Sequence, residues 1–222
     1  EEYGISSSEI TFGTFETDSV AIMASFENCQ AVLDKFSYNS LSKENQLTYD
    51  ILSSYINTSL EGAPYTLYDE PLSPLTGIHA QLPVLLAEYA FHTTDDVETY
   101  LQLIETTPAY FSSLIEFEQA KSDAGLFMSD VIVEEIIAQC NAFINMGENN
   151  YLLSTFEERL ATIEDITASQ KADYISQNQT LLESAILPAY QQLVSALSDL
   201  KGSGKNDLGL CYLPDGKQYY CY

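Results

Sequence analysis

The chain has 222 residues, and 45% of them are hydrophobic, which is enough to bury a substantial core. Its 33 Asp and Glu residues against 8 Lys and Arg residues give a formal net charge of −25 at pH 7. Nucleic acids and anionic membrane surfaces are bound by clustered cations, so this composition excludes both classes of partner.

The first part of the chain predicts an N-terminal arm followed by a pair of helices. Residues 1–17 alternate only weakly between polar and apolar, and we expect an extended arm there. From Asp18 or Ser19, either of which can cap the first amides, apolar residues recur with a helical period. Ser42 opens a second helix that ends near Gly62, and the short polar link predicts an antiparallel pair.

A proline-rich segment interrupts the helical pattern. Pro71, Pro74 and Gly77 favour an ordered loop or an extended segment over residues 63–77, and Pro83 lies in the first turn of the next helix or at a kink. Capping residues and apolar periodicity then predict helices over residues 78–90, from Thr94, from Thr107 to Gly125, from Ser129 to Gly147, and over residues 151–163.

The longest predicted helix begins with a capping box at Thr167 and reaches about Lys201. Pro188 should bend this helix, because an interior proline loses one hydrogen bond and clashes with the preceding turn. The overall prediction is one all-α, bundle-like domain of about seven to eight helices over residues 18–201.

The last part of the chain, residues 202–222, is predicted to leave the helical domain as an extended tail or a small β-hairpin. Cys211 and Cys221 flank a turn sequence and would face each other across a hairpin, where a disulfide and two free thiols are both open alternatives. Cys29 and Cys140 lie in apolar helical patterns, and we expect both to be buried thiols.

No pattern in the sequence assigns a catalytic, cofactor-binding or metal-binding residue. The two histidines, His79 and His92, lack the His-Glu-x-x-His spacing of a helical zinc site, and we interpret both as surface residues. No nucleophile elbow, Cys-x-x-Cys pair or glycine-rich phosphate loop occurs. The paired carboxylates are interpreted as solvated helix faces and first-turn charges; they are Asp95-Asp96, Glu134-Glu135 and Glu157-Glu158.

Several stretches, taken in order, nevertheless resemble a known family. They are Pro71–Gly77, Gln81–Leu86, Asp95–Ile104, Ile186–Leu193 and Leu213–Tyr220. Their order and spacing resemble the bacterial "domain of unknown function 885" family over roughly residues 45–222.

This resemblance implies the N-terminal, non-catalytic helical region of an exported zinc-dependent peptidase of the gluzincin type, similar in outline to carboxypeptidase Taq. The metal-binding motif of the family, a His-Glu segment followed by Pro-Gly-His-His, lies beyond the position that matches Tyr222. The resemblance therefore implies no catalytic, cofactor or metal residue here, with zinc expected in the missing C-terminal part. The expected partners are that C-terminal half and a peptide substrate. The helix around Pro188 and residues 74–86 would form part of the wall of the cleft that binds this substrate.

The expected localisation is extracellular or at the bacterial cell surface, with lipid anchoring as one form of export. The chain begins at Glu1 without Met, which suggests a removed upstream segment, and no apolar run is long enough for membrane insertion. The alternative is a self-standing helical binding or interaction module on a bacterial surface, with tyrosines that contact peptide or glycan. The aromatic end at Tyr219–Tyr222 favours the first interpretation, because it suggests further packing.

Overall fold

The structure is a computed structural model that describes residues 9–204 and 208–222. These residues form helices and loops with no β-strand among them, which confirms the all-α prediction. The helices of ten or more residues are α1 (Ser19–Leu33), α2 (Lys43–Gly62), α3 (Ile78–Glu88), α4 (Thr94–Glu105), α5 (Thr107–Asp123), α6 (Asp130–Ile144), α7 (Tyr151–Leu160), α8 (Ala168–Leu181) and α9 (Leu187–Leu200). Because a π-helical turn, η4 (Leu182–Ile186), joins α8 to α9, the described residues contain eight long rods, in line with the seven to eight expected.

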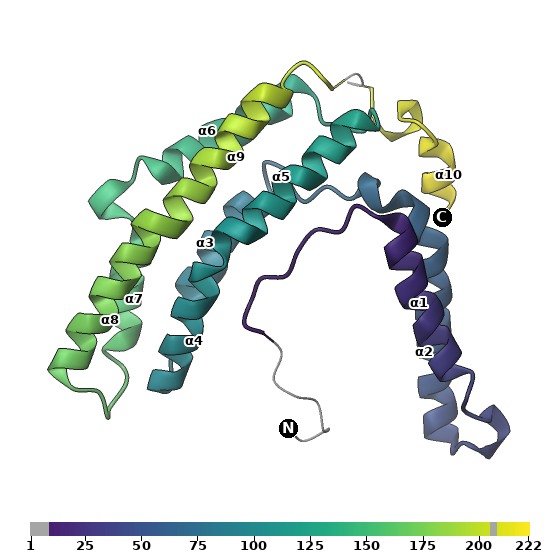
Figure 1. The fold of residues 1–222 in the computed structure, drawn as a ribbon, viewed down its shortest axis with the longest axis horizontal. Coiled ribbons are helices and arrows are strands. Elements are labelled where there is room, and N and C mark those ends of the chain that lie inside the picture. The colour runs from purple at the N-terminus through teal and green to yellow at the C-terminus, as the bar shows by residue number, and fades with distance from the viewer. Residues whose placement is uncertain (1–8, 205–207) are drawn as a thin grey trace.

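The rods are arranged as an arch with two limbs of unequal thickness (Figure 1). One limb, here called the arm, is the antiparallel pair α1 and α2, which the 3₁₀ turn η1 (Tyr38–Ser40) connects. The other limb, called the body, contains α3 to α9, with the short turn η3 (Gly147–Asn149) before α7. The arm meets the body at η2 (Ala63–Tyr68), which contacts α1, α2 and α5.

Most helix starts follow from local capping chemistry. The carboxylate of Asp18 accepts the N–H of Val20, the hydroxyl of Ser42 accepts that of Asn45, and Thr167 forms the predicted capping box. The predicted cap at Thr94 is wrong by one residue. Thr93 is the cap, because Asp96 lies three residues beyond it and its carboxylate accepts the N–H of Thr93 in return.

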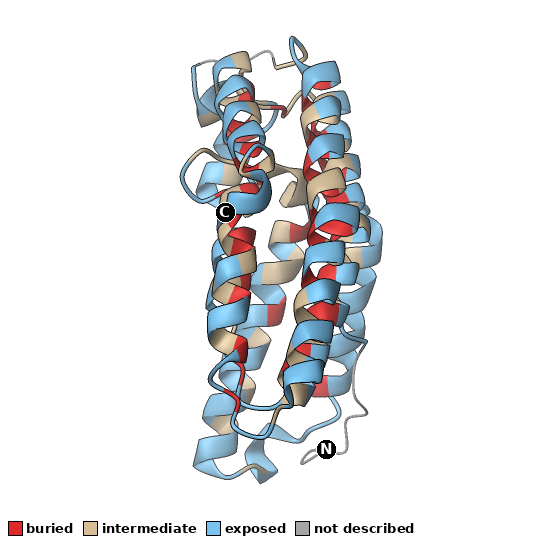
Figure 2. Ribbon diagram, turned by 90° about the vertical axis from the view of Figure 1, so that its left-hand side faces the viewer, coloured by how far each residue is buried: buried red, intermediate tan, exposed pale blue. Residues whose placement is uncertain are grey.

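The core lies in the body, where α9 packs between α5 and α6. Buried positions form stripes along the body helices, whereas their outer faces are exposed (Figure 2). The ring of Tyr190 on α9 lies 4.9 Å from the ring of Phe111 and 4.6 Å from that of Phe143, measured between centroids. Each fully buried apolar side chain of this size stabilises the fold by about 1.5–3 kcal/mol.

Pro83 lies inside α3, and a distant hydroxyl compensates for it. A proline has no N–H, so the carbonyl four residues earlier, that of His79, loses its helical donor. The hydroxyl of Tyr190, the fourth residue of α9, donates to this carbonyl at 2.7 Å. The interior proline is therefore tolerated because a buried tyrosine replaces the missing bond.

The irregularity expected at Pro188 takes the form of the π turn η4. Pro188 is the second residue of α9 and lies two residues after the end of η4, where the chain adopts the wider helix. The predicted continuous helix from Thr167 is otherwise present: residues of α9 are buried in the core, and Tyr174, Ile175 and Leu181 of α8 pack against it while partly buried.

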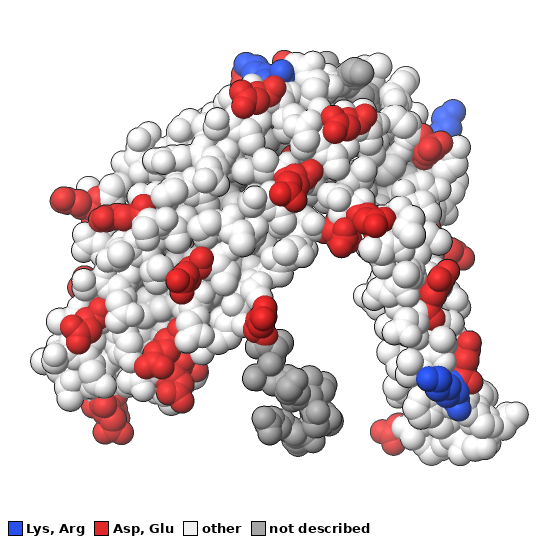
Figure 3. All heavy atoms as spheres, viewed as in Figure 1, with Lys and Arg blue, Asp and Glu red and all other residues white. Residues whose placement is uncertain are grey.

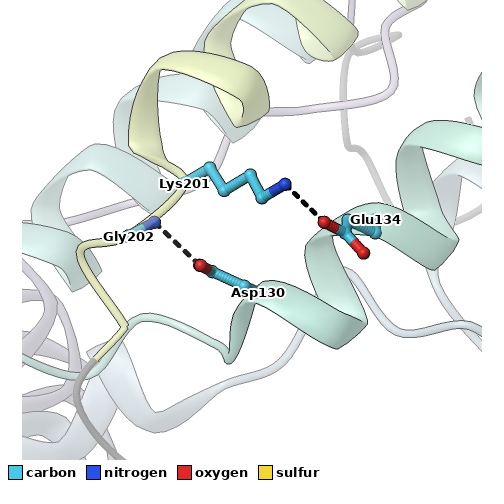
Figure 4. A network of polar contacts seen from close by, with 4 residues as sticks. All are labelled: Asp130, Glu134, Lys201 and Gly202. Carbon is cyan, nitrogen blue, oxygen red and sulfur yellow. Dashed lines mark hydrogen bonds and ion pairs between the residues drawn. The ribbon is translucent and has the colours of Figure 1, made fainter.

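A polar clamp fixes the end of α9 to the start of α6 (Figure 4). The ammonium of Lys201 pairs with the carboxylate of Glu134, and the N–H of Gly202 donates to Asp130 at 2.7 Å. An exposed ion pair of this kind contributes at most about 1 kcal/mol. Its effect is to hold two helix ends together where both leave the core.

The C-terminal hairpin predicted as one alternative is not formed. Described residues after 208 contain a 3₁₀ turn, η5 (Leu210–Tyr212), and a short helix, α10 (Gly216–Cys221), because Asp215 takes a left-handed conformation and starts a helix instead of a strand. Cys211 and Cys221 are free and exposed. Cys140 is buried as predicted, but the prediction for Cys29 is wrong, because α1 has only the arm to pack against on that side.

Candidate functional site

The two histidines lie in different environments and do not form a site together. His92 is exposed, and its backbone N–H donates to the carboxylate of Asp96 at 2.9 Å. The surface interpretation of His79 is wrong, since its side chain is 3% exposed and its Nε2 lies 2.7 Å from Oε1 of Gln139. Burial lowers the pKa of His79, and the bond to Gln139 opposes that shift.

The acidic pairs singled out from the sequence lie apart from one another on helix surfaces. Glu134 belongs to the polar clamp, Asp96 to the capping box of α4, and Glu157 and Glu158 are exposed on α7. Within residues 9–204 and 208–222, no three His, Cys, Asp or Glu side chains are placed to hold a metal ion.

The most distinctive concave feature is a hollow of about 650 Å³ where the arm meets the body, here called the junction hollow. Its walls come from the N-terminal segment, the start of α1, the loop after η2, the start of α3, and α5. These segments converge on the inner side of the arch (Figure 1). Residues distant in the sequence thus form one surface that no single motif encodes.

The N-terminal segment forms one wall of the junction hollow because two phenylalanines anchor it to α5. The rings of Phe12 and Phe15 lie 5.4 and 5.3 Å from the ring of Tyr110, and Phe15 lies 5.7 Å from Phe117. The N–H of Phe15 also donates to the hydroxyl of Ser113 at 3.2 Å. The N-terminal extension predicted over residues 1–17 is distinct from the α1–α2 arm. Its described part, residues 9–17, is docked on the body, and residues 1–8 lie outside the described residues.

Carboxylates dominate the charge around the hollow. Glu16, Asp69 and Glu70 line it, and acidic side chains gather on the inner side of the arch where the two limbs meet (Figure 3). The buried ammonium of Lys121 donates to the backbone carbonyl of Asp69 at 2.7 Å. Partial desolvation raises the pKa of Asp69, and the charge of Lys121 opposes that shift.

Glu118, on α5, is a buried acid beside this hollow. It is 1% exposed, and neither carboxylate oxygen has a hydrogen-bond partner among the described residues. Burial raises the pKa of Glu118 to about 7; the nearby charge of Lys121 lowers it, whereas that of Glu70 raises it further. Unpaired buried carboxylates are costly, and they concentrate at functional sites.

A cluster of four tyrosine rings closes the outer side of the junction. Tyr65 and Tyr68 of η2 stack against Tyr219 and Tyr222 of the C-terminal segment, with centroids 4.4 Å apart for Tyr68 and Tyr219 and 5.8 Å apart for Tyr65 and Tyr222. The ring of Tyr222 also lies against Gly62, where a larger residue would collide with it. The cluster ties α10 to the base of the arm and so fixes the direction of the arm.

The arm itself exposes an unusual amount of apolar surface. Along α2, Leu47, Ile51 and Tyr55 recur every four residues and are 62%, 59% and 62% exposed. Val20, Val32 and Phe36 are exposed on or next to α1. Isolated exposed apolar residues are ordinary, but a stripe along a helix marks a surface that packs against something else.

Sequence reasoning did not assemble the junction hollow: it expected residues 74–86, which include the lining residue Ile78, to wall a cleft, but it did not single out the acidic residues of the hollow. Glu118 and Lys121 lie in an amphipathic helix among other charged residues, and their burial depends on the tertiary contacts of α5, among them its contact with η2. The available signal was the helical period, since Glu118 lies four residues after Leu114 and seven after Phe111, on the apolar face of the helix.

The fold and these surfaces together define an all-helical protein with a rigid body and a projecting arm. The chain belongs to the family of bacterial proteins of unknown function called DUF885, whose sequence profile matches residues 17–222.

Comparison with solved structures supports the fold. The chain is similar to the crystal structure of "the putative lipoprotein from Colwellia psychrerythraea", with a TM-score of 0.75 and 16% sequence identity. The similarity covers 89% of this chain but only 36% of that one, so the chain spans about a third of the solved protein. No match was found among curated proteins. Within the described residues, no helix is both long and apolar enough to cross a membrane.

Proposed function

We propose that this chain is the N-terminal, non-catalytic helical region of a larger exported peptidase, in which it forms one wall of the substrate cleft. The body supplies a rigid support and the arm receives the C-terminal half of the parent protein. The zinc that the resemblance implies would be held by residues of that other half, and no residue of the present chain is assigned to it.

The single observation that carries this proposal is the apolar stripe on the arm. Leu47, Ile51 and Tyr55 are each about 60% exposed on a limb whose own two helices bury little. An arm of this kind is expected to pack against further protein. The similar solved chain is longer than the region matched here, which supports the presence of further protein to cover it.

Export to the bacterial surface is part of the same proposal. Its support is the excess of acidic residues and the fold shared with a protein whose description is a lipoprotein. Lipid anchoring of the present protein would be determined by mass analysis of the mature N-terminus isolated from cells.

Sequencing the coding DNA downstream of Tyr222 tests the proposal most directly. We expect an open frame that encodes a His-Glu segment and a Pro-Gly-His-His segment, and a purified product that contains about one zinc per chain and hydrolyses peptides. A stop codon directly after Tyr222 would overturn the proposal and favour the self-standing binding module. A full-length product without zinc or hydrolysis would overturn the peptidase assignment alone.

The docking role of the arm has its own test in the full-length product. Amides of α2 around Ile51 should exchange with solvent much more slowly there than in the 222-residue chain, because further protein covers the stripe. Equal exchange rates in both would contradict the docking role. The exposed α7 residue Glu158 provides a control region whose exchange should not change.

A further inference from the structure

The junction hollow combines carboxylates with apolar walls in a way that fits an organic cation. Phe15, Ile78 and Phe117 supply apolar surface, and Glu16, Asp69 and Glu70 supply negative charge. The carboxylate of Glu16 already accepts the N–H groups of Thr17 and Asp18 at 2.9 Å. The side chains of Asp69 and Glu70 accept no hydrogen bond from any described residue, so their acceptor capacity is free.

We propose that the junction hollow binds a primary ammonium group carried on an apolar stem, as found at the free amino end of a peptide or on a lysine side chain. The ammonium would lie against Asp69 and Glu70, and the stem would lie against the rings of Phe15 and Phe117. Such a mixed surface favours a ligand that combines an apolar stem with a cationic head. The cation is also attracted to the face of an aromatic ring.

The buried acid Glu118 follows the lining residue Phe117 on α5 and adds negative charge next to the hollow. Its charge is coupled to that of Glu70, a lining residue, and the only ammonium beside it is that of Lys121 among the described residues. Lys121 donates to a backbone carbonyl and lies more than 4 Å from every described carboxylate oxygen. The ammonium of Lys121 thus acts on Asp69 and Glu118, while Glu16 and Glu70 add further negative charge at the hollow, and an incoming ammonium would offset this excess.

The geometry favours an organic cation over a bare metal ion. Divalent cations require several oxygen atoms converging at short distances, and the described residues contain no such group. Here the carboxylates come from two separate segments and alternate with aromatic and aliphatic walls. The assignment of the ammonium to a peptide rests on the proposed function, whereas the preference of the hollow for a cation does not.

Titration of the ¹⁵N-labelled 222-residue chain with three small probes tests the proposal. L-leucinamide carries a free α-ammonium, Nα-acetyl-L-lysinamide carries only a side-chain ammonium, and Nα-acetyl-L-leucinamide is neutral. At a pH of about 6.5 both amines are protonated. We expect at least one cationic probe to shift the amide signals of Phe15, Glu70 and Phe117 saturably, and the neutral probe to leave them unchanged.

The two cationic probes distinguish the sources of the ammonium. Binding of L-leucinamide alone identifies the amino end of a peptide, binding of the lysine derivative alone identifies lysine side chains, and binding of both identifies the ammonium itself. Binding of neither, or equal binding of the neutral probe, would overturn the proposal.

Matched variants locate the interaction. Glu70→Gln and Asp69→Asn should each weaken binding of the cationic probe about two- to fivefold, and the double variant should weaken it more than about tenfold. Glu105→Gln removes the same charge from an exposed position on α4, away from the hollow, and should leave binding unchanged. An equal loss in Glu105→Gln would show a general charge effect and contradict the site.

These outcomes are separate from those of the proposed function. The probes report binding by the present chain alone, whatever lies downstream. Failure to bind ammonium would leave the peptidase proposal standing with another substrate class. A full-length product without peptidase activity would leave a cation-binding hollow whose ligand is not a peptide.

Discussion

The body and the arm are built from the same kind of amphipathic helix, yet they differ in what their apolar faces contact. In the body, the side chains of Tyr100, Phe111, Phe156 and Tyr190 are fully buried by helices from distant parts of the chain. In the arm, α1 and α2 pack chiefly against each other, and Leu33 and Ile56 are the buried apolar residues among them. A helical pattern alone therefore reveals an apolar face, but tertiary partners decide whether that face is core or surface.

The largest expected effect is in the body, at Leu193. Its side chain is fully buried on α9, the helix that packs against both α5 and α6. Leu193→Ala removes this apolar surface and leaves a cavity, so we expect a loss of about 2–5 kcal/mol in the free energy of unfolding, measured by urea denaturation. A loss below about 1 kcal/mol would contradict the conclusion that the body contains the tightly packed core.

An intermediate effect is expected at the junction, where Glu118 makes stability depend on pH. The pKa of its carboxyl is about 7 in the folded chain, against 4.5 as the ordinary value, so the folded state keeps a proton that the unfolded state has released. The free energy of unfolding should therefore fall as pH rises from about 4.5 to about 7, and remain lower above that range.

Glu118→Gln removes this dependence, and should be more stable than the natural chain by roughly 1–3 kcal/mol at pH 8, with little difference near pH 4.5. Urea midpoints across the pH range measure the effect. Glu105→Gln, at an exposed site on α4, serves as the control and should follow the natural chain. The same pH profile in Glu118→Gln and in the natural chain would contradict the role of Glu118.

The smallest expected effect is on the arm, at Ile51. Because its side chain is 59% exposed, Ile51→Ser should change the free energy of unfolding of the 222-residue chain by less than about 0.5 kcal/mol. Urea denaturation of Ile51→Ser and Leu193→Ala under the same conditions compares the arm and the body directly. A loss of more than about 1 kcal/mol would show that the stripe is covered in the chain alone.

Much of the fold could be predicted from the sequence because helix ends are set by local chemistry. Asp18, Ser42 and Thr167 each place a side-chain oxygen next to the first free amides, and the structure uses all three as caps. The correct cap of α4 could also be predicted locally, because Thr93, unlike Thr94, has an acid three residues later. The all-α class follows from these signals and from apolar periodicity.

Burial and the candidate site could not be predicted, because both depend on contacts between distant segments. His79 is buried by Gln139, about sixty residues away, and its carbonyl is bound by Tyr190, which lies 111 residues away. Cys29 is exposed for the opposite reason, since no body helix among the described residues packs on that side of the arm. The hollow combines the N-terminal segment with η2 and α5, and no spacing within one segment indicates it.

The π turn between α8 and α9 constrains how this protein tolerates insertions and deletions during evolution. A π turn holds one residue more than the α-helical turn it replaces, and each residue of an α-helix advances the side chains by about 100°. Deleting one residue from Leu182–Ile186 would restore a regular helical turn and leave Tyr190 and Leu193 on the faces they now contact, whereas a deletion in the regular part of α9 before them would rotate them by about 100°. Loss of one residue should therefore be tolerated at this turn, whereas changes in length elsewhere in the rod should be rare.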